Sequence, residues 1–136
     1  MQRIFDMYKT PNHGIYSLSI KQSLVTNDYS ESFNIGGVEA LIADLLEVTK
    51  DLDAWVLLQR PESNVGVTQD ALIPMMQGYL KLQQAGCKAV GIVENSLFVH
   101  SGTPHNPAEL TMPINIHKDE HYLREWLEKI LKKIKI

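Results

Sequence analysis

The histidines are the residues of this chain whose spacing most suggests metal chemistry, and there are five. His117 and His121 lie four positions apart, which on a helix places both side chains on one face, as in zinc sites. His117, however, precedes the expected helix, and no third ligand follows at a matching spacing. His100 and His105 flank a loop that could bring them together, but no His-Glu-x-x-His pattern accompanies them. We therefore predict no metal site and no cofactor.

The candidate nucleophiles lack the neighbours that catalysis requires. Cys87 is the single cysteine and follows a helix-ending glycine, whereas a reactive thiolate needs a helix N-terminus or a nearby base. We expect it to be a small, partly buried apolar residue. Segment 62–64 has no Gly-x-Ser-x-Gly elbow, and Gly36-Gly37 is followed by no phosphate-loop pattern. Because no acid, base, nucleophile or metal set is assembled, we predict no catalytic residue and no enzyme.

A hydroxyl at an expected helix start is the regulatory candidate. Thr68 precedes the apolar stripe of residues 68–85, where a phosphate would meet free N–H groups and the positive end of the helix dipole. The structural alternative is an N-cap threonine, which contributes about 1 kcal/mol to its helix. Ser63 and Asn64 lie in the loop just before it. Residues 62–68 and the following helix are thus the predicted contact surface for a protein partner.

A proline inside the same helical region suggests a ligand pocket. Pro74 removes one helical hydrogen bond and crowds the preceding turn, so the helix either kinks there or begins its regular part near Ile73. A kinked helix beside a sheet could leave an adjustable cavity, although methionines on a helical stripe more commonly fill the core. The side chains expected to line the cavity are Met75, Met76, Tyr79 and Phe98.

Hydrophobic periodicity predicts the elements that would position these groups. Alternating or continuous apolar runs predict strands at residues 4–8, 15–20, 54–58, 88–93 and 113–116, the first two forming a hairpin around a turn at 11–14. Residues 96–100 could add a further strand. Apolar residues three or four apart predict helices at 38–48, 68–85 and 118–135. The polar stretch 24–35 is predicted to be a loop with helical turns, and 101–110 a loop.

Composition and element order together indicate one α/β domain covering residues 1–136, a small mixed sheet with helices packed on it. Apolar residues make up 44% and charged residues 21% of the chain, with a net charge of −3, which excludes a disordered tail. This charge argues against nucleic-acid binding. No apolar run spans a bilayer and no secretory signal is present, so we expect a cytoplasmic protein that is not integral to a membrane.

Three stretches resemble STAS-like proteins of the SpoIIAA type, the anti-sigma-factor antagonists. The first is Trp55-Val56-Leu57-Leu58, a strand that enters a loop and a helix ending in Leu82-Gln83-Gln84-Ala85-Gly86. The second is Ala89-Val90-Gly91-Ile92-Val93, and the third is Pro113-Ile114-Asn115-Ile116-His117 followed by Tyr122-Leu123-Arg124-Glu125-Trp126-Leu127. The resemblance covers roughly residues 15–131 and implies a STAS-like fold. It also implies docking to a protein partner, such as a regulatory kinase or a sigma-factor-system protein.

The chain departs from that family in two places. Antagonists carry an Asp-Ser-Ser-Gly-like motif whose serine is phosphorylated, whereas this chain has Val65-Gly66-Val67-Thr68-Gln69-Asp70, with Thr68 roughly at the serine position. The region after Val93, helical in the family, is rich in proline and histidine here. Lipid-binding relatives of the fold hold an apolar ligand beside the sheet.

Two functions therefore stay open. The first is a non-enzymatic STAS-like regulatory or protein-docking module. The alternative is a carrier or sensor of a small hydrophobic ligand, held between the sheet and the helix that contains Pro74. The apolar tip Ile134-Lys135-Ile136 could in addition join a homodimer interface.

Overall fold

The computed structural model describes residues 2–8 and 14–134. Six strands form one mixed sheet in the order β1-β2-β3-β5-β7-β8. Its first two pairings are antiparallel, and β3–β5, β5–β7 and β7–β8 are parallel. The strand bounds are β1 Gln2–Tyr8, β2 Ile15–Lys21, β3 Leu24–Ser30, β5 Trp55–Pro61, β7 Cys87–Val93 and β8 Ile114–His117. A second sheet pairs β4 Ser32–Phe33 with β6 Gly66–Val67 in parallel.

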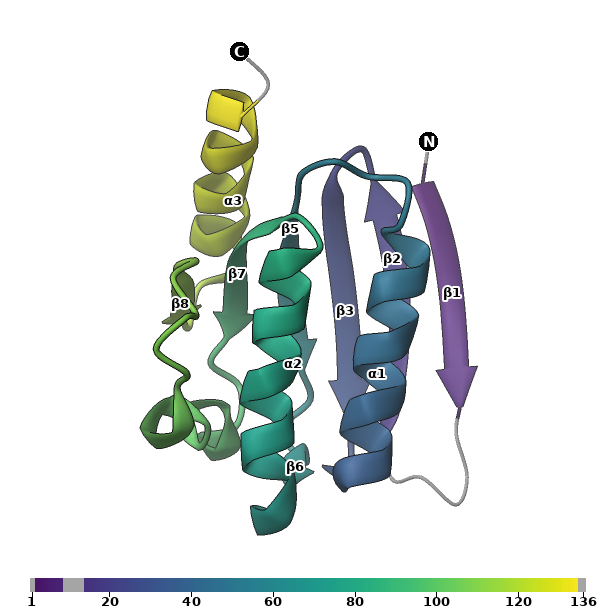
Figure 1. The fold of residues 1–136 in the computed structure, drawn as a ribbon, viewed down its shortest axis with the longest axis vertical. Helices are drawn as coiled ribbons and strands as arrows, with labels where there is room; N and C mark the ends of the chain where they lie inside the picture. Colours follow the sequence, from purple (N-terminus) through teal and green to yellow (C-terminus); the bar gives the residue numbers. More distant parts are fainter. Residues whose placement is uncertain (1, 9–13, 135–136) are drawn as a thin grey trace.

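Three helices cover this sheet from both sides. They are α1 Ile35–Val48, α2 Leu72–Gln84 and α3 Glu120–Ile134. In Figure 1, α1 and α2 lie side by side in front of the strands. Leu57 and Val90 face the core cluster that holds Leu45 and Leu82 of these two helices. Leu58 and Ala89 point the other way and pack against α3. The predicted mixed sheet with helices on it is therefore confirmed.

The main error of the sequence prediction is the stretch 24–35. It was expected to be a loop, but residues Leu24–Ser30 form β3 in the middle of the sheet, and Ser32–Phe33 form β4. The polar Asn27 is completely buried there. Its burial is tolerated because its Oδ1 atom accepts a hydrogen bond from Gln59 on the adjacent strand. Because the polar residues of this strand find hydrogen-bond partners on adjacent strands, they can be buried. The strand therefore lacks the alternation of apolar and polar residues by which a strand is predicted.

The N-terminal hairpin is confirmed, since β1 pairs antiparallel with β2; the predicted turn at 11–14 lies outside the described residues except for Gly14. The first helix begins earlier than expected, at Ile35, because Asn34 caps it through Oδ1, which accepts the Gly37 N–H at 2.8 Å. The fifth strand runs past Leu58 to Pro61. These differences all extend a predicted element at one end.

The second helix differs from the prediction at its start. Residues Gln69–Ala71 form a separate 3₁₀ turn, η1, and α2 runs continuously from Leu72 with Pro74 in its first turn. A proline is tolerated there because the first N–H groups of a helix have no intrahelical partner. Of the two predicted alternatives, the helix therefore begins near Ile73 and does not kink at Pro74. Gly86 ends the helix with φ at +107°, as its position predicted.

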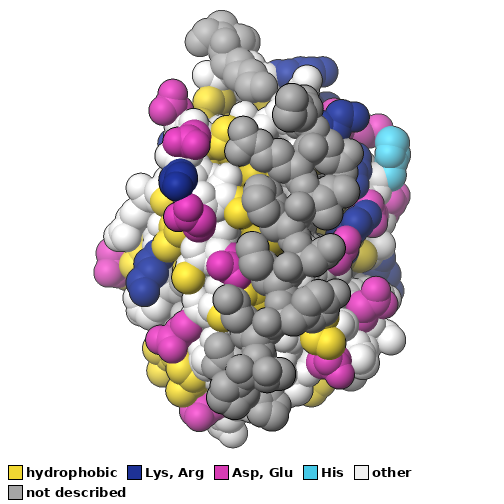
Figure 2. Space-filling view, turned by 90° about the vertical axis from the view of Figure 1, so that its right-hand side faces the viewer, with side chains coloured by type: hydrophobic (Ala, Val, Ile, Leu, Met, Phe, Trp, Pro, Cys, Tyr) yellow, Lys and Arg dark blue, Asp and Glu magenta, His cyan; other side chains and the backbone are white. Residues whose placement is uncertain are grey.

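Between β7 and β8 the described residues form no strand. The expected strand at 96–100 is instead the 3₁₀ turn η2 Leu97–His100, and the expected loop at 101–110 holds η3 Thr103–His105. On the side of the molecule shown in Figure 2, acidic and basic side chains are interspersed among the coloured atoms. Across residues 2–8 and 14–134, none of the helices combines the length and apolar character needed to cross a membrane.

Candidate functional site

A cavity of about 230 Å³ lies at the end of the sheet where the parallel strands terminate. Tyr29 near the end of β3, Val65 and Val67 after β5, and Ile92 near the end of β7 form one part of its wall. Ligands of open α/β sheets commonly bind outside the carboxyl ends of the strands, where connecting segments diverge. The position of this cavity therefore makes it the candidate site.

The four predicted pocket residues all line this cavity. Met75, Met76 and Tyr79 contribute from α2, and Phe98 contributes from η2. Met76 and Tyr79 are buried, whereas the Phe98 side chain is 49% exposed and forms part of the rim. The structure thus brings these side chains together; that they hold a ligand stays a prediction.

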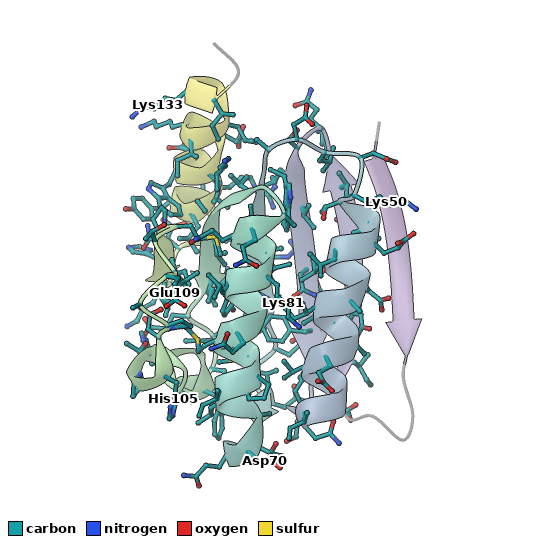
Figure 3. All side chains as sticks on the ribbon, viewed as in Figure 1. Lys50, Asp70, Lys81, His105, Glu109 and Lys133 are labelled. Carbon is teal, nitrogen blue, oxygen red and sulfur yellow. The ribbon has the colours of Figure 1, made fainter. Side chains whose placement is uncertain are left out.

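The segment from Ser96 to Met112 forms the opposite wall of the cavity. Ser96 anchors its start: the Oγ atom donates to the Val65 carbonyl at 3.1 Å and accepts the Phe98 N–H at 3.2 Å. Gln83 of α2 anchors its end, because Oε1 accepts the N–H groups of Thr111 and Met112 at 2.8 and 2.9 Å. In Figure 3 the labelled His105 and Asp70 lie at the end of the molecule that holds the cavity, and Lys133 lies at the opposite end.

Gly102 sets how closely this segment approaches α2. A Cβ atom at Gly102 would lie 2.5 Å from the Met76 sulfur and 2.6 Å from the Met75 terminal methyl. Both methionines end in flexible, polarizable groups, so the wall between the segment and the helix can adjust. The sequence pattern indicated the methionines but not this glycine, whose only signal was its position in a proline- and histidine-rich stretch.

A chain of buried polar side chains begins at the cavity wall. The Tyr79 hydroxyl donates to Gln59 Oε1, and Gln59 Nε2 donates to Asn27 Oδ1 at 2.9 Å. Burial raises the pKa of the Tyr79 hydroxyl well above its usual value. Burial likewise raises the pKa of Tyr29, which also lines the cavity. Both phenols are therefore neutral at physiological pH.

A smaller cavity of about 40 Å³ lies between α1, α2 and the sheet. It shares Tyr29, Val67, Met75 and Tyr79 with the larger one. Tyr29 was not among the predicted cavity residues, because it belongs to the strand that was predicted to be a loop. The alternation of Asn27 and Tyr29, two residues apart on one strand face, was the only available signal.

The predicted switch residues lie outside this cavity and are exposed. Ser63 and Asn64 form the turn after β5, and Thr68 follows β6. Thr68 does not cap α2: its hydroxyl donates to Asp70 Oδ1 at 2.6 Å, and the N-cap of α2 is Ala71. The expectation of an N-cap threonine on this helix is thus wrong, because the intervening 3₁₀ turn separates Thr68 from it.

His100, His117 and His121 each pair with a different group. His100 pairs with Glu94 at 2.5 Å, and this hydrogen bond lowers the pKa of the Glu94 carboxyl. His117 Nδ1 accepts the Asp119 N–H at 2.9 Å, and His121 pairs with Glu125 at 2.7 Å. Within the described part of the chain, no three side chains of His, Cys, Asp or Glu are grouped to hold a metal ion.

Cys87 has the environment expected from its position. The side chain is buried, at 1% exposure, and this burial raises the pKa of the thiol to about 12. A thiol in such surroundings is a weak nucleophile at neutral pH.

The arrangement of strands and helices matches a solved structure. An uncharacterised protein from the DUF3478 family of Shewanella loihica PV-4, described as having a SpoIIAA-like fold, superimposes with a TM-score of 0.53 at 13% sequence identity. The match covers 89% of this chain and 98% of that one. The chain has a SpoIIAA-like fold. This confirms the expected architecture, while at this identity the likeness to the SpoIIAA-like protein extends to the fold alone. No protein-family model and no curated protein matches the sequence.

Proposed function

We propose that this SpoIIAA-like protein is a non-enzymatic binding module for a small, mainly apolar molecule. The observation that carries the proposal is the cavity of about 230 Å³ at the carboxyl ends of the parallel strands. An apolar cavity of about 150 Å³ accepts a benzene molecule. The present cavity therefore suits a ligand somewhat larger than one aromatic ring.

The composition of the wall supports the same proposal. Valine, isoleucine, leucine and methionine side chains dominate it, with a few polar groups, which is typical of small-molecule sites. Phe98 lies at the rim and is about half exposed. A ring at that position could cover a bound molecule and move aside when it leaves.

Native mass spectrometry tests whether the cavity carries a ligand. We expect the protein purified from its own host to retain an apolar molecule of low mass, released on denaturation. Met75→Trp should abolish this adduct, because an indole at position 75 would fill the cavity. The matched control is Ile73→Trp, which introduces the same side chain two residues earlier at a site that is 57% exposed.

Two results would contradict this function. One is protein without an adduct that also fails to bind any small apolar probe in solution. The other is equal loss of binding in Met75→Trp and Ile73→Trp, since that would trace the effect to the helix rather than to the cavity.

Docking to a protein partner is the second candidate. The observation in its favour is that Ser63, Asn64 and Thr68 are all exposed at one end of the molecule. A phosphate on Thr68 would lie beside the Asp70 carboxylate, and the repulsion would change the surface locally. The single buried cysteine fits a reducing compartment such as the cytoplasm.

Affinity capture from host cells tests the docking surface. We expect Thr68→Glu to lower recovery of a specific partner, because it adds a negative charge beside Asp70. Gln84→Glu is the control, since it adds the same charge at an exposed position at the far end of α2. Equal recovery with both variants would remove the docking surface from consideration.

A further inference from the structure

The hydrogen bonds beneath the cavity have a fixed direction. Asn27 Nδ2 donates to the Ser17 carbonyl at 3.3 Å, so its Oδ1 is the atom that accepts from Gln59. The Gln59 Oε1 atom therefore faces Tyr79, and the Tyr79 hydroxyl donates its only proton to that oxygen. The Tyr79 hydroxyl oxygen can still accept a hydrogen bond through a lone pair, because a phenol has one donor and two acceptor sites.

Tyr29 provides the complementary group. It lines both cavities together with Tyr79, and a charge on Tyr79 would raise the pKa of Tyr29. Within the described part of the chain, the Tyr29 hydroxyl makes no hydrogen bond, although the ring packs edge-on against Phe33 with centroids 5.8 Å apart. Its proton and its lone pairs are thus both available to a bound molecule.

The remaining wall offers no charge. None of the described residues that line the larger cavity is aspartate, glutamate, lysine, arginine or histidine. A carboxylate or an ammonium group buried there would lose its hydration without gaining a charged partner. The site therefore favours an uncharged ligand.

We propose that the ligand is a neutral, mainly apolar molecule bearing a hydroxyl group, which donates to the Tyr79 oxygen and accepts from the Tyr29 hydroxyl. This inference rests on the proposed function and specifies the chemistry of its ligand. A hydroxyl supplies both the donor and the acceptor that this pair of tyrosines requires. An ether or a ketone supplies acceptors only and leaves the Tyr79 lone pair unused.

Three probes of similar size separate these chemistries: 1-octanol, its isomer heptyl methyl ether, and octanoate at neutral pH. Dissociation constants are measured by protein-observed NMR titration, which also identifies the site from shifts of amides around Gly102. We expect 1-octanol to bind about threefold to tenfold more tightly than the ether, the range for one additional hydrogen bond. Octanoate should bind more weakly than 1-octanol by about tenfold or more.

Tyr29→Phe tests the hydrogen bond that the Tyr29 hydroxyl donates to the bound molecule. This variant keeps the ring that packs on Phe33 and removes the hydroxyl alone. We expect it to weaken the binding of both 1-octanol and the ether by about threefold to tenfold, because each loses the hydrogen bond donated by Tyr29, while the preference for the alcohol, which depends on Tyr79, is retained. Tyr122→Phe is the matched control: Tyr122 is 45% exposed on α3, across the sheet from the cavity, and its variant should bind both probes as tightly as the unmodified protein does.

The outcomes distinguish this inference from the function on which it rests. Equal binding of the alcohol and the ether by the unmodified protein overturns the inference and leaves an apolar binding module. Binding of both probes by Tyr29→Phe that is as tight as binding by the unmodified protein also overturns it. Failure of every probe to bind overturns the proposed function, and the inference falls with it.

Discussion

Asn27, Gln59 and Tyr79 are three polar side chains that the fold buries almost completely, at 0%, 4% and 7% exposure. Each finds its partner in another of the three, or on the backbone. A buried polar group without a partner costs more than a hydrogen bond contributes. These residues thus require the partners that this sheet provides. The direction of their hydrogen bonds determines which polar atoms face the cavity.

Tyr79→Phe should destabilise the protein by about 1–3 kcal/mol, because Gln59 Oε1 would lose its donor inside the core. Urea unfolding monitored by circular dichroism measures this change. Tyr122→Phe should stay within about 0.5 kcal/mol of the unmodified protein, since that ring is half-exposed on the surface. Equal effects of the two substitutions would mean that the Tyr79 hydroxyl is not held as described.

Cys87 should resist thiol reagents in the native protein. Its pKa is raised to about 12 from 9.0 by burial, so at about pH 8 the reactive thiolate is scarcely populated until the chain unfolds. The raised pKa also stabilises the fold below pH 9.0, and this stabilisation is lost as pH rises toward 12. The labelling rate with Ellman's reagent should follow the unfolded fraction as denaturant is added. Rapid labelling without denaturant would contradict this.

At the level of elements, the first two helices approach each other closely while the third lies alone. A Cβ atom on Gly78 of α2 would lie 2.6 Å from Cγ1 and 2.7 Å from Cδ1 of Ile42 on α1. On the other face, Gly91 of β7 allows Leu123 and Leu127 of α3 to approach the sheet. Glycines at these two positions therefore set the distances between layers.

Gly78→Ala places two effects in opposition. Alanine favours a helix interior over glycine by about 1 kcal/mol, while overpacking against Ile42 costs about 1–3 kcal/mol. We expect a net loss of stability of about 1 kcal/mol, measured by urea unfolding. Adding Ile42→Val should recover part of that loss, and Gln77→Ala on the exposed side of α2 serves as control. A gain of stability in Gly78→Ala would show that the helices can separate at little cost.

For the whole molecule, one sheet supports two cores of unequal size. The larger core contains Leu45 and Trp55 and is covered by α1 and α2; the smaller contains Leu127 and is covered by α3, with Trp126 packed against it. Arg60 connects the layers on the smaller side, contacting Asp28 of β3 and Glu120 of α3. We propose that both cores unfold together as one domain.

Leu45→Ala and Leu127→Ala test that cooperativity. Each removes a side chain of 0% exposure, so each should lower the free energy of unfolding by about 2–5 kcal/mol. Because Trp55 and Trp126 report on opposite faces, single-tryptophan variants should show the same midpoint in urea, shifted equally by either substitution. Separate midpoints for the two tryptophans would show that the faces unfold independently.

The sequence by itself determined the three helices and the strands with apolar patterns, because amphipathic periodicity follows directly from which face of an element is buried. The SpoIIAA-like architecture was implied by the resemblance of three stretches to that family. The sequence also indicated the four cavity residues of α2 and η2, since methionine and aromatic residues near a proline suggest an adjustable wall.

Only the tertiary structure decided that residues 24–30 form a central strand and that Ser96 to Met112 close a cavity. The polar residues of the strand are satisfied by Gln59, which is distant in sequence, and the closing segment is held by Gln83 and Val65 rather than by any pattern of its own. Partners of this kind are chosen by three-dimensional proximity, and local sequence spacing does not encode them.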